Sequence, residues 1–316
     1  MDTIRAFPAL AELRGADVLS SADLSRDQTL EVLRLARAFK AEGLRLDLGG
    51  MVLGLIFRKA STRTRVSFSV AMARLGGQTI DLDPQVSQVG RGEPVADTAR
   101  VLSRYCDALA VRTFAQEELL EYAHWATIPV INALTDLEHP CQALADFLTL
   151  QEAFGEIDGL TLAYVGDGNN VAHSLLLCGA LLGVNVRIGC PPGYAPSDAV
   201  LAQARALART GTELSVLHDP VATVRGAQAL YTDVWASMGQ EQEQSDREQA
   251  FRGWCLDEAL LAEADPRAIV LHCLPAHRGE EISSGVIEGM ASRVFDQAEN
   301  RLHAQQALLA ALLAPA

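Results

Sequence analysis

The 316-residue chain is short of positive charge, and this limits what it can bind. It carries 26 Lys and Arg against 40 Asp and Glu, which gives a net charge of −14 and a pI near 4.9. Nucleic acid or an acidic lipid surface would be repelled over most of such a molecule. A small anionic substrate is compatible with this charge, because a few arginines in a cleft outweigh a distant negative field at close range. We therefore expect no nucleic-acid partner and no membrane partner.

Three further features are missing: a secretory signal, a membrane span and paired cysteines. The start, MDTIRAFPAL, lacks the basic end, apolar run and small-residue cleavage site of a signal peptide. No uncharged apolar stretch reaches the roughly 18 residues of a membrane helix. The cysteines are scattered without a CxxC pair, which argues against a zinc ribbon and a disulfide framework. They are Cys106, Cys141, Cys178, Cys190, Cys255 and Cys273. These absences predict a soluble, reduced, cytoplasmic protein.

What the chain does have is enough apolar residues for a large core, at 49% hydrophobic and 21% charged. Short apolar runs alternate with helical patterns. We expect strands at 51–57, 108–111, 129–132, 161–165, 184–188, 214–216, 229–231 and 268–271. We expect helices from about residue 25, and at 66–75, 140–154, 174–182 and 199–209. Strands separated by helices predict the α/β class, with two doubly wound parallel-sheet domains joined by helices. The polar run 240–249 is expected to be a mobile surface loop.

The first polar motif, Ser61-Thr62-Arg63-Thr64-Arg65, lies between an apolar strand and a helix. Three hydroxyls, two guanidinium groups and the free N–H groups of a helix start favour an anion site, most naturally for phosphate. The alternative is a polar turn in which the hydroxyls cap the helix and the arginines are solvated. In parallel sheets, ligands bind at the carboxyl ends of strands, where this motif lies.

Two other residues of the first half occupy similar positions. His139 precedes Pro140, which suits the first turn of a helix, so the histidine falls among the free N–H groups of a helix start. Arg112 ends the strand 108–111 at a ligand-facing edge. The alternatives are a structural histidine and a surface arginine, and neither residue alone shows that a ligand binds here.

The motif Gly166-Asp167-Gly168-Asn169-Asn170 follows the strand 161–165 and invites a dinucleotide interpretation. The third glycine of GxGxxG is replaced by Val171, and the next strand ends in Ile188-Gly189-Cys190 without the acidic residue that would hold a ribose. A nicotinamide enzyme is therefore not expected. Asn170 offers both a donor and an acceptor, which suits an amino-acid head group.

Two motifs follow later strands. In Asp233-Val234-Trp235-Ala236-Ser237-Met238-Gly239 the aspartate and serine could hold an ammonium and a carboxylate, although a helix cap is equally plausible. His272-Cys273-Leu274-Pro275 ends the strand 268–271. A cysteine at this position could be reactive, whereas buried cysteines are usually inert.

Taken together and in this order, the motifs resemble those of the aspartate/ornithine carbamoyltransferase family, and the resemblance covers nearly the whole chain. The first two motifs are shared by both branches. Ser-Met-Gly and the cysteine of the last motif point to the ornithine branch. The resemblance implies transfer of the carbamoyl group of carbamoyl phosphate to the side-chain amine of L-ornithine, giving L-citrulline and phosphate.

Carried over position by position, the resemblance implies two sets of binding residues. Those for carbamoyl phosphate are Ser61, Thr62, Arg63, Thr64, Gln88, Arg112, His139, Gln142, Cys273, Leu274 and Arg301. Those for ornithine are Leu134, Asn170, Asp233, Ser237 and Met238. Gln88 would reach a neighbouring subunit's site in the family's trimer. The catalytic residues would be Cys273, Arg112, His139 and Asp233.

The implied reaction needs these residue types. Arginine and histidine donors stabilise the oxyanion that forms when an uncharged amine attacks the carbamoyl carbon. The amine has a pKa near the lysine value of about 10.4, so the site must bind its rare neutral form or help to remove its proton. Asp233 and Cys273 would do so together. No metal and no organic cofactor is required.

The resemblance also implies an organisation. We expect a carbamoyl phosphate-binding domain over residues 1–145, with a C-terminal helix over 296–316 packing back on it. An ornithine-binding domain would cover 146–295, with the active site in the interdomain cleft. A homotrimer or a multiple of it is expected, acting in arginine biosynthesis, although the residues do not separate synthesis from breakdown. The rivals are a carbamoyltransferase for putrescine or an acylated ornithine, and a non-catalytic paralogue. Retention of residues 61–65, His139, Asp233 and Cys273 argues against the paralogue.

Overall fold

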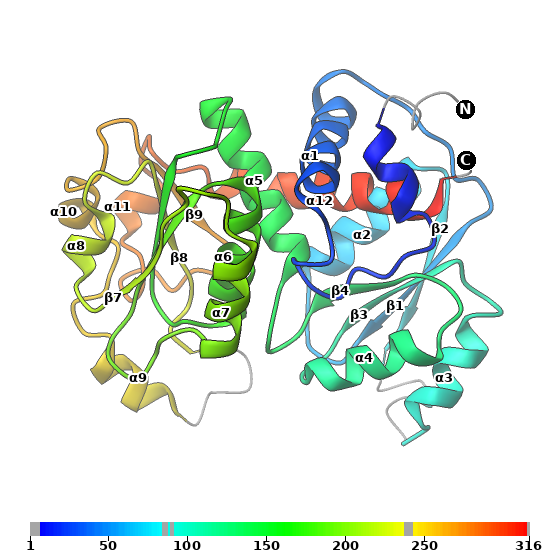
Figure 1. Cartoon of the computed structure of the whole chain (residues 1–316). Helices are drawn as coiled ribbons and strands as arrows, with labels where there is room; N and C mark the ends of the chain where they lie inside the picture. The colour runs from blue at the N-terminus through cyan, green and yellow to red at the C-terminus, as the bar shows by residue number, and fades with distance from the viewer. Residues whose placement is uncertain (1–6, 84–87, 89–91, 237–242, 315–316) are drawn as a thin grey trace. The chain divides into compact units, whose positions relative to one another are not determined.

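A computed structural model describes residues 7–83, 88, 92–236 and 243–314. The chain divides into two compact units, one of Met1–Leu148 with Asn300–Ala316 and one of Thr149–Glu299. Each unit contains one wholly parallel sheet with helices packed against it (Figure 1). The predicted fold of two parallel-sheet α/β units is therefore confirmed. Among the described residues, no helix is long and apolar enough to cross a membrane.

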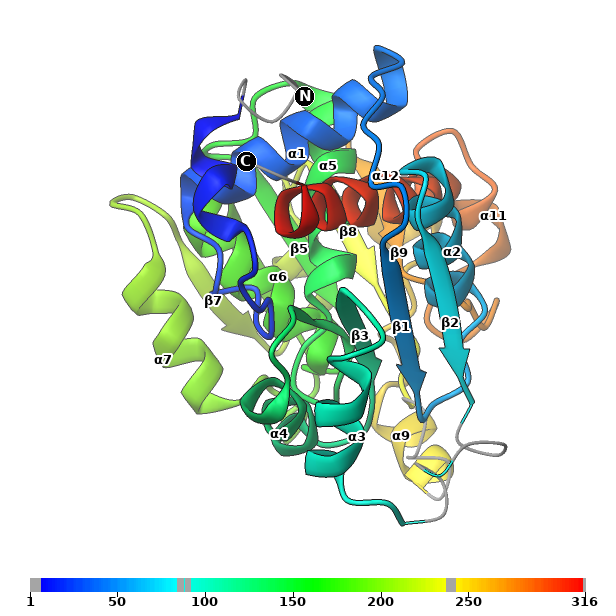
Figure 2. The ribbon, with the colours of Figure 1, turned by 90° about the vertical axis from the view of Figure 1, so that its right-hand side faces the viewer.

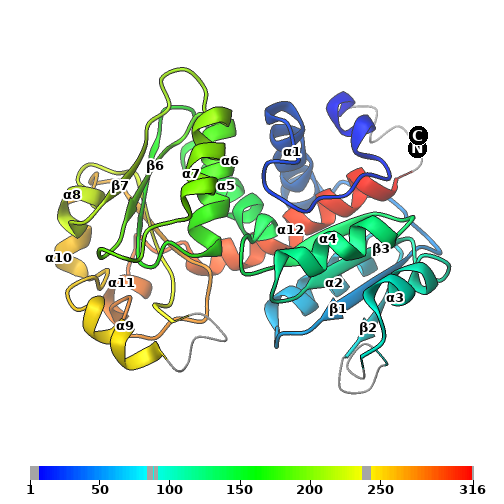
Figure 3. The same ribbon diagram turned by 60° about the horizontal axis from the view of Figure 1, so that its bottom comes forward.

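The first unit has a four-stranded sheet in the order β2-β1-β3-β4. Its strands are β1 (Val52–Phe57), β2 (Gln78–Leu82), β3 (Ala108–Arg112) and β4 (Val130–Leu134). Its helices are the 3-10 helix η2 (Pro8–Leu13), α1 (Arg26–Ala41), α2 (Arg63–Arg74), α3 (Val95–Leu102) and α4 (Gln116–Trp125). Figure 2 shows β2 beside β1 at one edge, and Figure 3 shows α3 and α4 on one face of the sheet. Side chains of these two helices form a buried core with the sheet.

The second unit has a five-stranded sheet in the order β7-β6-β5-β8-β9. Its strands are β5 (Thr161–Val165), β6 (Asn185–Gly189), β7 (Leu214–Leu217), β8 (Ala229–Thr232) and β9 (Ile269–His272). Its helices are α6 (Asn170–Leu182), α7 (Asp198–Leu207), α8 (Pro220–Val224), α9 (Gln244–Ala250), α10 (Glu258–Leu261) and α11 (Ser284–Ile287). Helices α6 and α7 cover one face, and α8, α10 and α11 cover the other (Figure 1). Two longer helices, α5 (Pro140–Phe154) and α12 (Val294–Leu313), contribute residues to both units.

Local sequence signals explain why several elements begin and end where they do. Ser25 caps α1 in a capping box, because its side chain accepts from the Gln28 N–H and the Gln28 side chain accepts from the Ser25 N–H. Gly183 ends α6 in the left-handed conformation, with φ at 81°. All but the first residue of β1 are buried, as expected for a strand in the middle of a parallel sheet.

Several elements differ from the sequence expectation, among them α2, α6, β2 and α9. Helix α2 begins earlier than expected, because its first turn consists of polar motif residues rather than apolar ones. Helix α6 begins at Asn170 rather than Ser174, because Asn169 caps it before the expected start. The edge strand β2 was not expected, since most of its residues are exposed and no apolar run marks it. The expectation of a loop over 240–249 was wrong for residues 244–249, which belong to α9, and residues 240–242 lie outside the described residues. Arg247 anchors this polar helix by a buried ion pair with Asp167, and such tertiary contacts stabilise most short helices.

Candidate active site

The carboxyl edge of the first sheet aligns two predicted residues. In the register of the parallel strands, Arg112 at the end of β3 lies between Phe57 of β1 and Leu134 of β4. Arg112 is buried, and Leu134 is half-buried. A cation is therefore held at the edge where ligands of parallel sheets bind.

Arg301 of α12 connects residues that lie far apart in the sequence. Its Nη2 donates to Thr64 Oγ1 at 2.8 Å, and its Nη1 donates to Gln142 Oε1 at 2.6 Å. The Gln142 amide donates in turn to Asp146 Oδ1 at 2.7 Å. All four side chains are buried. Three of the residues that the resemblance implies for carbamoyl phosphate are thus hydrogen-bonded in one network within the first unit.

His139 lies at the start of α5, where its carbonyl accepts from the Gln142 and Ala143 N–H groups. Burial lowers the pKa of its imidazole well below the usual 6.5, and the positive charges of Arg301, Arg112 and Arg63 lower it further. The ring is therefore uncharged at neutral pH. A neutral imidazole still offers one N–H donor, which can be directed at a ligand oxygen without the desolvation cost of a buried cation.

The Ser-Thr-Arg-Thr-Arg motif supplies the first turn of α2. Thr62 occupies the N-cap position, but its side chain makes no capping hydrogen bond to any described residue. The N–H groups of the first helical turn have no acceptor within the helix, so they can bind an anion. Ser61 is half-buried, whereas Thr62 and Arg63 are exposed.

Arg65 has a different partner from the expected one. Its Nη1 lies 3.1 Å from Asp81 Oδ2 of the edge strand β2, and its guanidinium lies over the Phe57 ring. Of the two arginines expected at the anion site, Arg65 is therefore engaged with Asp81 and Phe57, and Arg63 is the candidate that is left. The sequence could not reveal this, because β2 itself was not recognised.

Three further residues were predicted for the site: Gln88, Ser237 and Met238. Gln88 is exposed, and its carbonyl accepts from the Glu93 N–H at 3.3 Å. Ser237 and Met238 lie outside the described residues. The roles that the resemblance implies for these three residues stay predictions.

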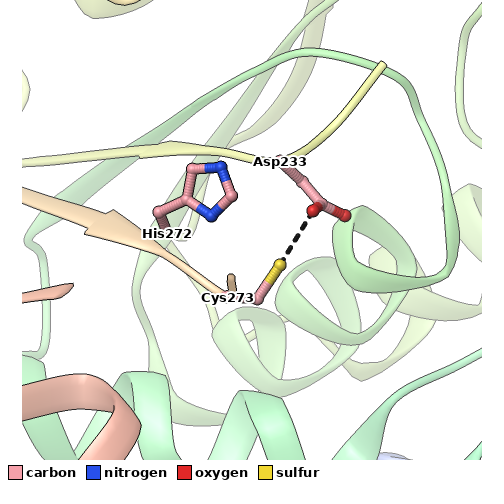
Figure 4. A group of neighbouring side chains, drawn as sticks. All are labelled: Asp233, His272 and Cys273. Carbon is pink, nitrogen blue, oxygen red and sulfur yellow. Dashed lines mark hydrogen bonds between the residues drawn. The ribbon is translucent and has the colours of Figure 1, made fainter. Parts of the chain in front are cut away.

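In the second unit, Asp233 and Cys273 form a hydrogen-bonded pair. They follow the neighbouring strands β8 and β9, in which Thr232 is aligned with His272. The thiol of Cys273 donates to Asp233 Oδ1 at 2.9 Å (Figure 4). Asp233 is buried and Cys273 is half-buried. A carboxylate that accepts from a thiol can take or pass on a proton through it, as the implied removal of a proton from an amine requires.

Asn169 was not predicted as a site residue, but it contacts this pair. Its Nδ2 donates to Asp233 Oδ2 at 2.8 Å. Its Oδ1 caps α6 by accepting from the Val171 and Ala172 N–H groups. The predicted residue Asn170 is the first residue of α6 and is half-buried. An asparagine before an apolar helical run is an N-cap signal, so earlier placement of the helix start would have identified Asn169.

His272 supports the segment that carries Cys273. Its Nδ1 accepts from the Leu274 N–H at 2.8 Å, so its Nε2 carries the proton that is shared with Glu281 Oε1 at 3.0 Å. Leu274 has φ at 58°, in the left-handed region that is unfavourable for leucine. The His272 bond therefore helps to hold Leu274 in this conformation. Glu281 has no sequence signal, because only the folded chain brings it to the histidine.

Ligating atoms of Asp233, His272 and Cys273 lie within 4.8 Å of one another, which is a spacing that metal sites share. Both ring nitrogens of His272 are already engaged, by the Leu274 N–H and by Glu281. A metal ion at this position would have to displace one of these bonds. The arrangement fits a hydrogen-bonded proton-transfer pair better than a metal centre.

Family models match both parts of the chain. Residues 16–152 match the family model described as the carbamoyl-P binding domain of aspartate/ornithine carbamoyltransferase, and residues 158–312 match its Asp/Orn binding domain. The chain is 74% identical over 304 residues to an ornithine carbamoyltransferase of Prochlorococcus marinus (strain MIT 9313), and the match covers 96% of each chain.

Two solved structures are also similar over almost their whole length. The ornithine carbamoyltransferase of Gloeobacter violaceus is 56% identical with a TM-score of 0.87, covering 95% of this chain and 99% of the other. That of Pyrococcus furiosus is 48% identical with a TM-score of 0.92, covering 96% and 99%. The chain therefore belongs to the aspartate/ornithine carbamoyltransferase family.

Proposed function

We propose that the chain catalyses transfer of the carbamoyl group of carbamoyl phosphate to the side-chain amine of L-ornithine, giving L-citrulline and phosphate. The observation that carries this proposal is the combination of two groups of side chains. One holds Arg63, Arg112 and Arg301 around a neutral, buried His139. The other holds Asp233 against Cys273. The first suits a phosphorylated, polar substrate, and the second suits removal of a proton from an amine.

In the proposed reaction, the neutral amine nitrogen attacks the carbamoyl carbon and forms the new C–N bond. The carbonyl oxygen becomes an oxyanion, which the neutral His139 N–H and the Arg112 guanidinium stabilise by hydrogen bonding. The bond from carbon to the phosphate oxygen then breaks, and phosphate leaves with the electron pair. Arg63, the hydroxyls of Ser61, Thr62 and Thr64 and the first-turn N–H groups of α2 neutralise the leaving group.

Arg301 and Gln142 are proposed to fix the relative positions of the side chains that bind carbamoyl phosphate, since Arg301 connects Thr64 to Gln142. Cys273 and Leu274 are proposed to contact the carbamoyl end, and Gln88 to act across a subunit boundary. The amine proton is proposed to leave through Cys273 to Asp233, which accepts from the thiol at 2.9 Å. None of these steps needs a metal or an organic cofactor.

The ornithine residues are proposed to be Leu134, Asn170, Asp233, Ser237 and Met238. The relatives named above are ornithine carbamoyltransferases, which favours ornithine over putrescine, an acylated ornithine or aspartate. A cytoplasmic location, a homotrimer and a role in arginine biosynthesis follow from the family resemblance as further proposals.

The test is direct. Purified protein is incubated with carbamoyl phosphate and L-ornithine, and citrulline and phosphate are measured together. The proposal requires the two products to appear in equal amounts, and a Cys273→Ala variant to form them much more slowly. Phosphate release without citrulline would instead indicate hydrolysis of carbamoyl phosphate, and the transfer proposal would be wrong.

A further inference from the structure

The side chain of Asn169 is held in one orientation by the start of α6. Its Oδ1 accepts from the Val171 N–H at 3.0 Å and from the Ala172 N–H at 3.2 Å. The hydroxyl of Tyr164 donates to the same oxygen at 3.3 Å. Three donors on one atom identify it as the amide oxygen rather than the amide nitrogen, so the position of Nδ2 is also fixed.

The fixed amide nitrogen points at the candidate proton acceptor. Asn169 Nδ2 donates to Asp233 Oδ2 at 2.8 Å, while Asp233 Oδ1 accepts from the Cys273 thiol and from the Val234 N–H. The three side chains follow β5, β8 and β9, which are consecutive strands of the sheet. The two carboxylate oxygens of Asp233 thus have different partners, and the one bound by Asn169 faces away from the thiol.

We propose that Asn169 is a positioning residue, which orients Asp233 so that Oδ1 receives the proton of Cys273. This inference rests on the proposed function, because it assigns a task within the same proton path. A buried carboxylate is costly unless it accepts hydrogen bonds, and a bond to a charged group is stronger than one between neutral groups. Without the amide donor, Asp233 would rotate to find another partner, and its contact with the thiol would be lost for part of the time.

A helix cap alone would also explain an asparagine at this position, so the test must separate the two roles. Asn169→Ser keeps a capping oxygen for the Val171 and Ala172 N–H groups, but a serine is too short to reach Asp233. Asn169→Asp keeps both the cap and the length, and places a second carboxylate against Asp233 in place of a donor. Like charges at this distance disfavour two ionised groups.

The chain offers a matched control in Asp219. Its Oδ1 caps α8 by accepting from the Val221 and Ala222 N–H groups at 2.9 and 3.0 Å, the same arrangement as that of Asn169 on α6. Asp219→Ser therefore makes the same change of cap without touching the Asp233 pair. Thermal unfolding of Asp219→Ser measures the cost of an altered cap, and thermal unfolding of Asn169→Ser measures that cost together with the loss of the bond to Asp233.

Three measurements are made on each variant: kcat for citrulline formation, KM for carbamoyl phosphate, and the rate of Cys273 alkylation by iodoacetamide, followed on its own peptide. We expect Asn169→Ser to lower kcat by about 10- to 100-fold, the range for one hydrogen bond to a charged group, and to leave the KM for carbamoyl phosphate little changed. The alkylation rate of Cys273 should change, because the thiolate is the reactive form of a cysteine and the thiol would lose its fixed proton acceptor for part of the time. Asp219→Ser should change none of the three.

A double-mutant cycle with Asp233→Asn tests whether Asn169 acts through Asp233. In that background, Asn169→Ser should have little further effect on kcat, because the carboxylate it orients is gone. The inference would be overturned if the fold-losses of kcat in Asn169→Ser and Asp233→Asn multiplied fully in the double variant. It would also be overturned if Asn169→Ser and Asp219→Ser lost kcat equally. If Asn169→Ser does not fold, Asn169→Asp is judged by the same criteria.

The two proposals can fail separately. A wild-type protein that forms no citrulline would remove the proposed function. A wild-type protein that forms citrulline, with an Asn169→Ser variant that keeps both kcat and the Cys273 alkylation rate, would remove only the positioning role.

Discussion

The Cys273 thiol donates to Asp233 Oδ1 at 2.9 Å, and both residues come directly after the ends of neighbouring parallel strands. Adjacent parallel strands end at the same edge of a sheet, so the backbone itself brings the two side chains together. Asp233 has two further donors, the Val234 N–H and the Asn169 amide. The pair is thus held by the sheet and by hydrogen bonds on both carboxylate oxygens.

Asp233→Ala should weaken ornithine binding far more than carbamoyl phosphate binding. Asp233 belongs to the second unit, whereas Arg63, Arg112, His139 and Arg301 belong to the first. We expect a loss of about 10-fold or more in ornithine affinity, typical of removing a charged hydrogen-bonding partner. Calorimetric titration of each substrate checks this. An equal loss of affinity for both would assign Asp233 a general structural role.

Arg63→Ala should weaken the binding of carbamoyl phosphate and of the product phosphate, because the anion site would lose its charged donor. Arg65→Ala is the matched control, since it lies in the same helix but pairs with Asp81 at the surface. Exposed ion pairs contribute only about 0–1 kcal/mol to stability, so this control should stay folded and active. Steady-state kinetics and phosphate inhibition are measured for both. Equal behaviour of the two variants would contradict the assignment of the motif.

His139 should make the protein less stable in mild acid. Its pKa is near 6.5 in the unfolded chain and well below that value in the folded one. Between these two values the unfolded state binds more protons, so the free energy of unfolding falls as the pH drops below about 6.5. His139→Gln should make this fall less steep. Denaturant unfolding from pH 7.5 down to pH 5 measures it, and an unchanged slope in the variant would mean that His139 is not held neutral.

Arg247→Met should strongly destabilise the second unit. Its Nη1 donates to Asp167 Oδ2 and to the Trp235 carbonyl, and burial raises the pKa of Asp167 while the Arg247 charge opposes the rise. Removing one partner leaves a buried charge without its counter-ion, which costs about 3–5 kcal/mol. Arg209→Met, which breaks an exposed pair with Asp158, should cost less than about 1 kcal/mol. Similar losses of unfolding free energy in the two variants would contradict this difference.

The alternation of apolar runs and helical patterns predicted both sheets, because buried parallel strands are nearly continuous apolar segments. The same reasoning failed for β2, whose residues are mostly exposed. It also failed for α9, whose polar sequence is stabilised by Arg247. Motifs at strand ends located Asp233 and Cys273, but not the direction in which each hydrogen bond runs. Glu281 and the pairing of Arg65 with Asp81 depend on tertiary contacts, which the order of residues does not reveal. Asn169 carries an N-cap signal, but its contact with Asp233 is likewise tertiary.

The acceptor that we propose for the carbamoyl group is a free amino acid, L-ornithine. The most direct measurement compares kcat/KM for L-ornithine, putrescine, N-acetylornithine and L-aspartate at saturating carbamoyl phosphate. A site that hydrogen-bonds both the ammonium and the carboxylate of ornithine rejects an analogue that lacks one of them by about 10⁴-fold, because buried polar groups are left unpaired. We therefore expect ornithine to be preferred over putrescine and N-acetylornithine by a factor of this order. L-Aspartate has both groups but no side-chain amine, so it should also be a very poor substrate. Carbamoylation of putrescine or aspartate as efficiently as ornithine would contradict the claim.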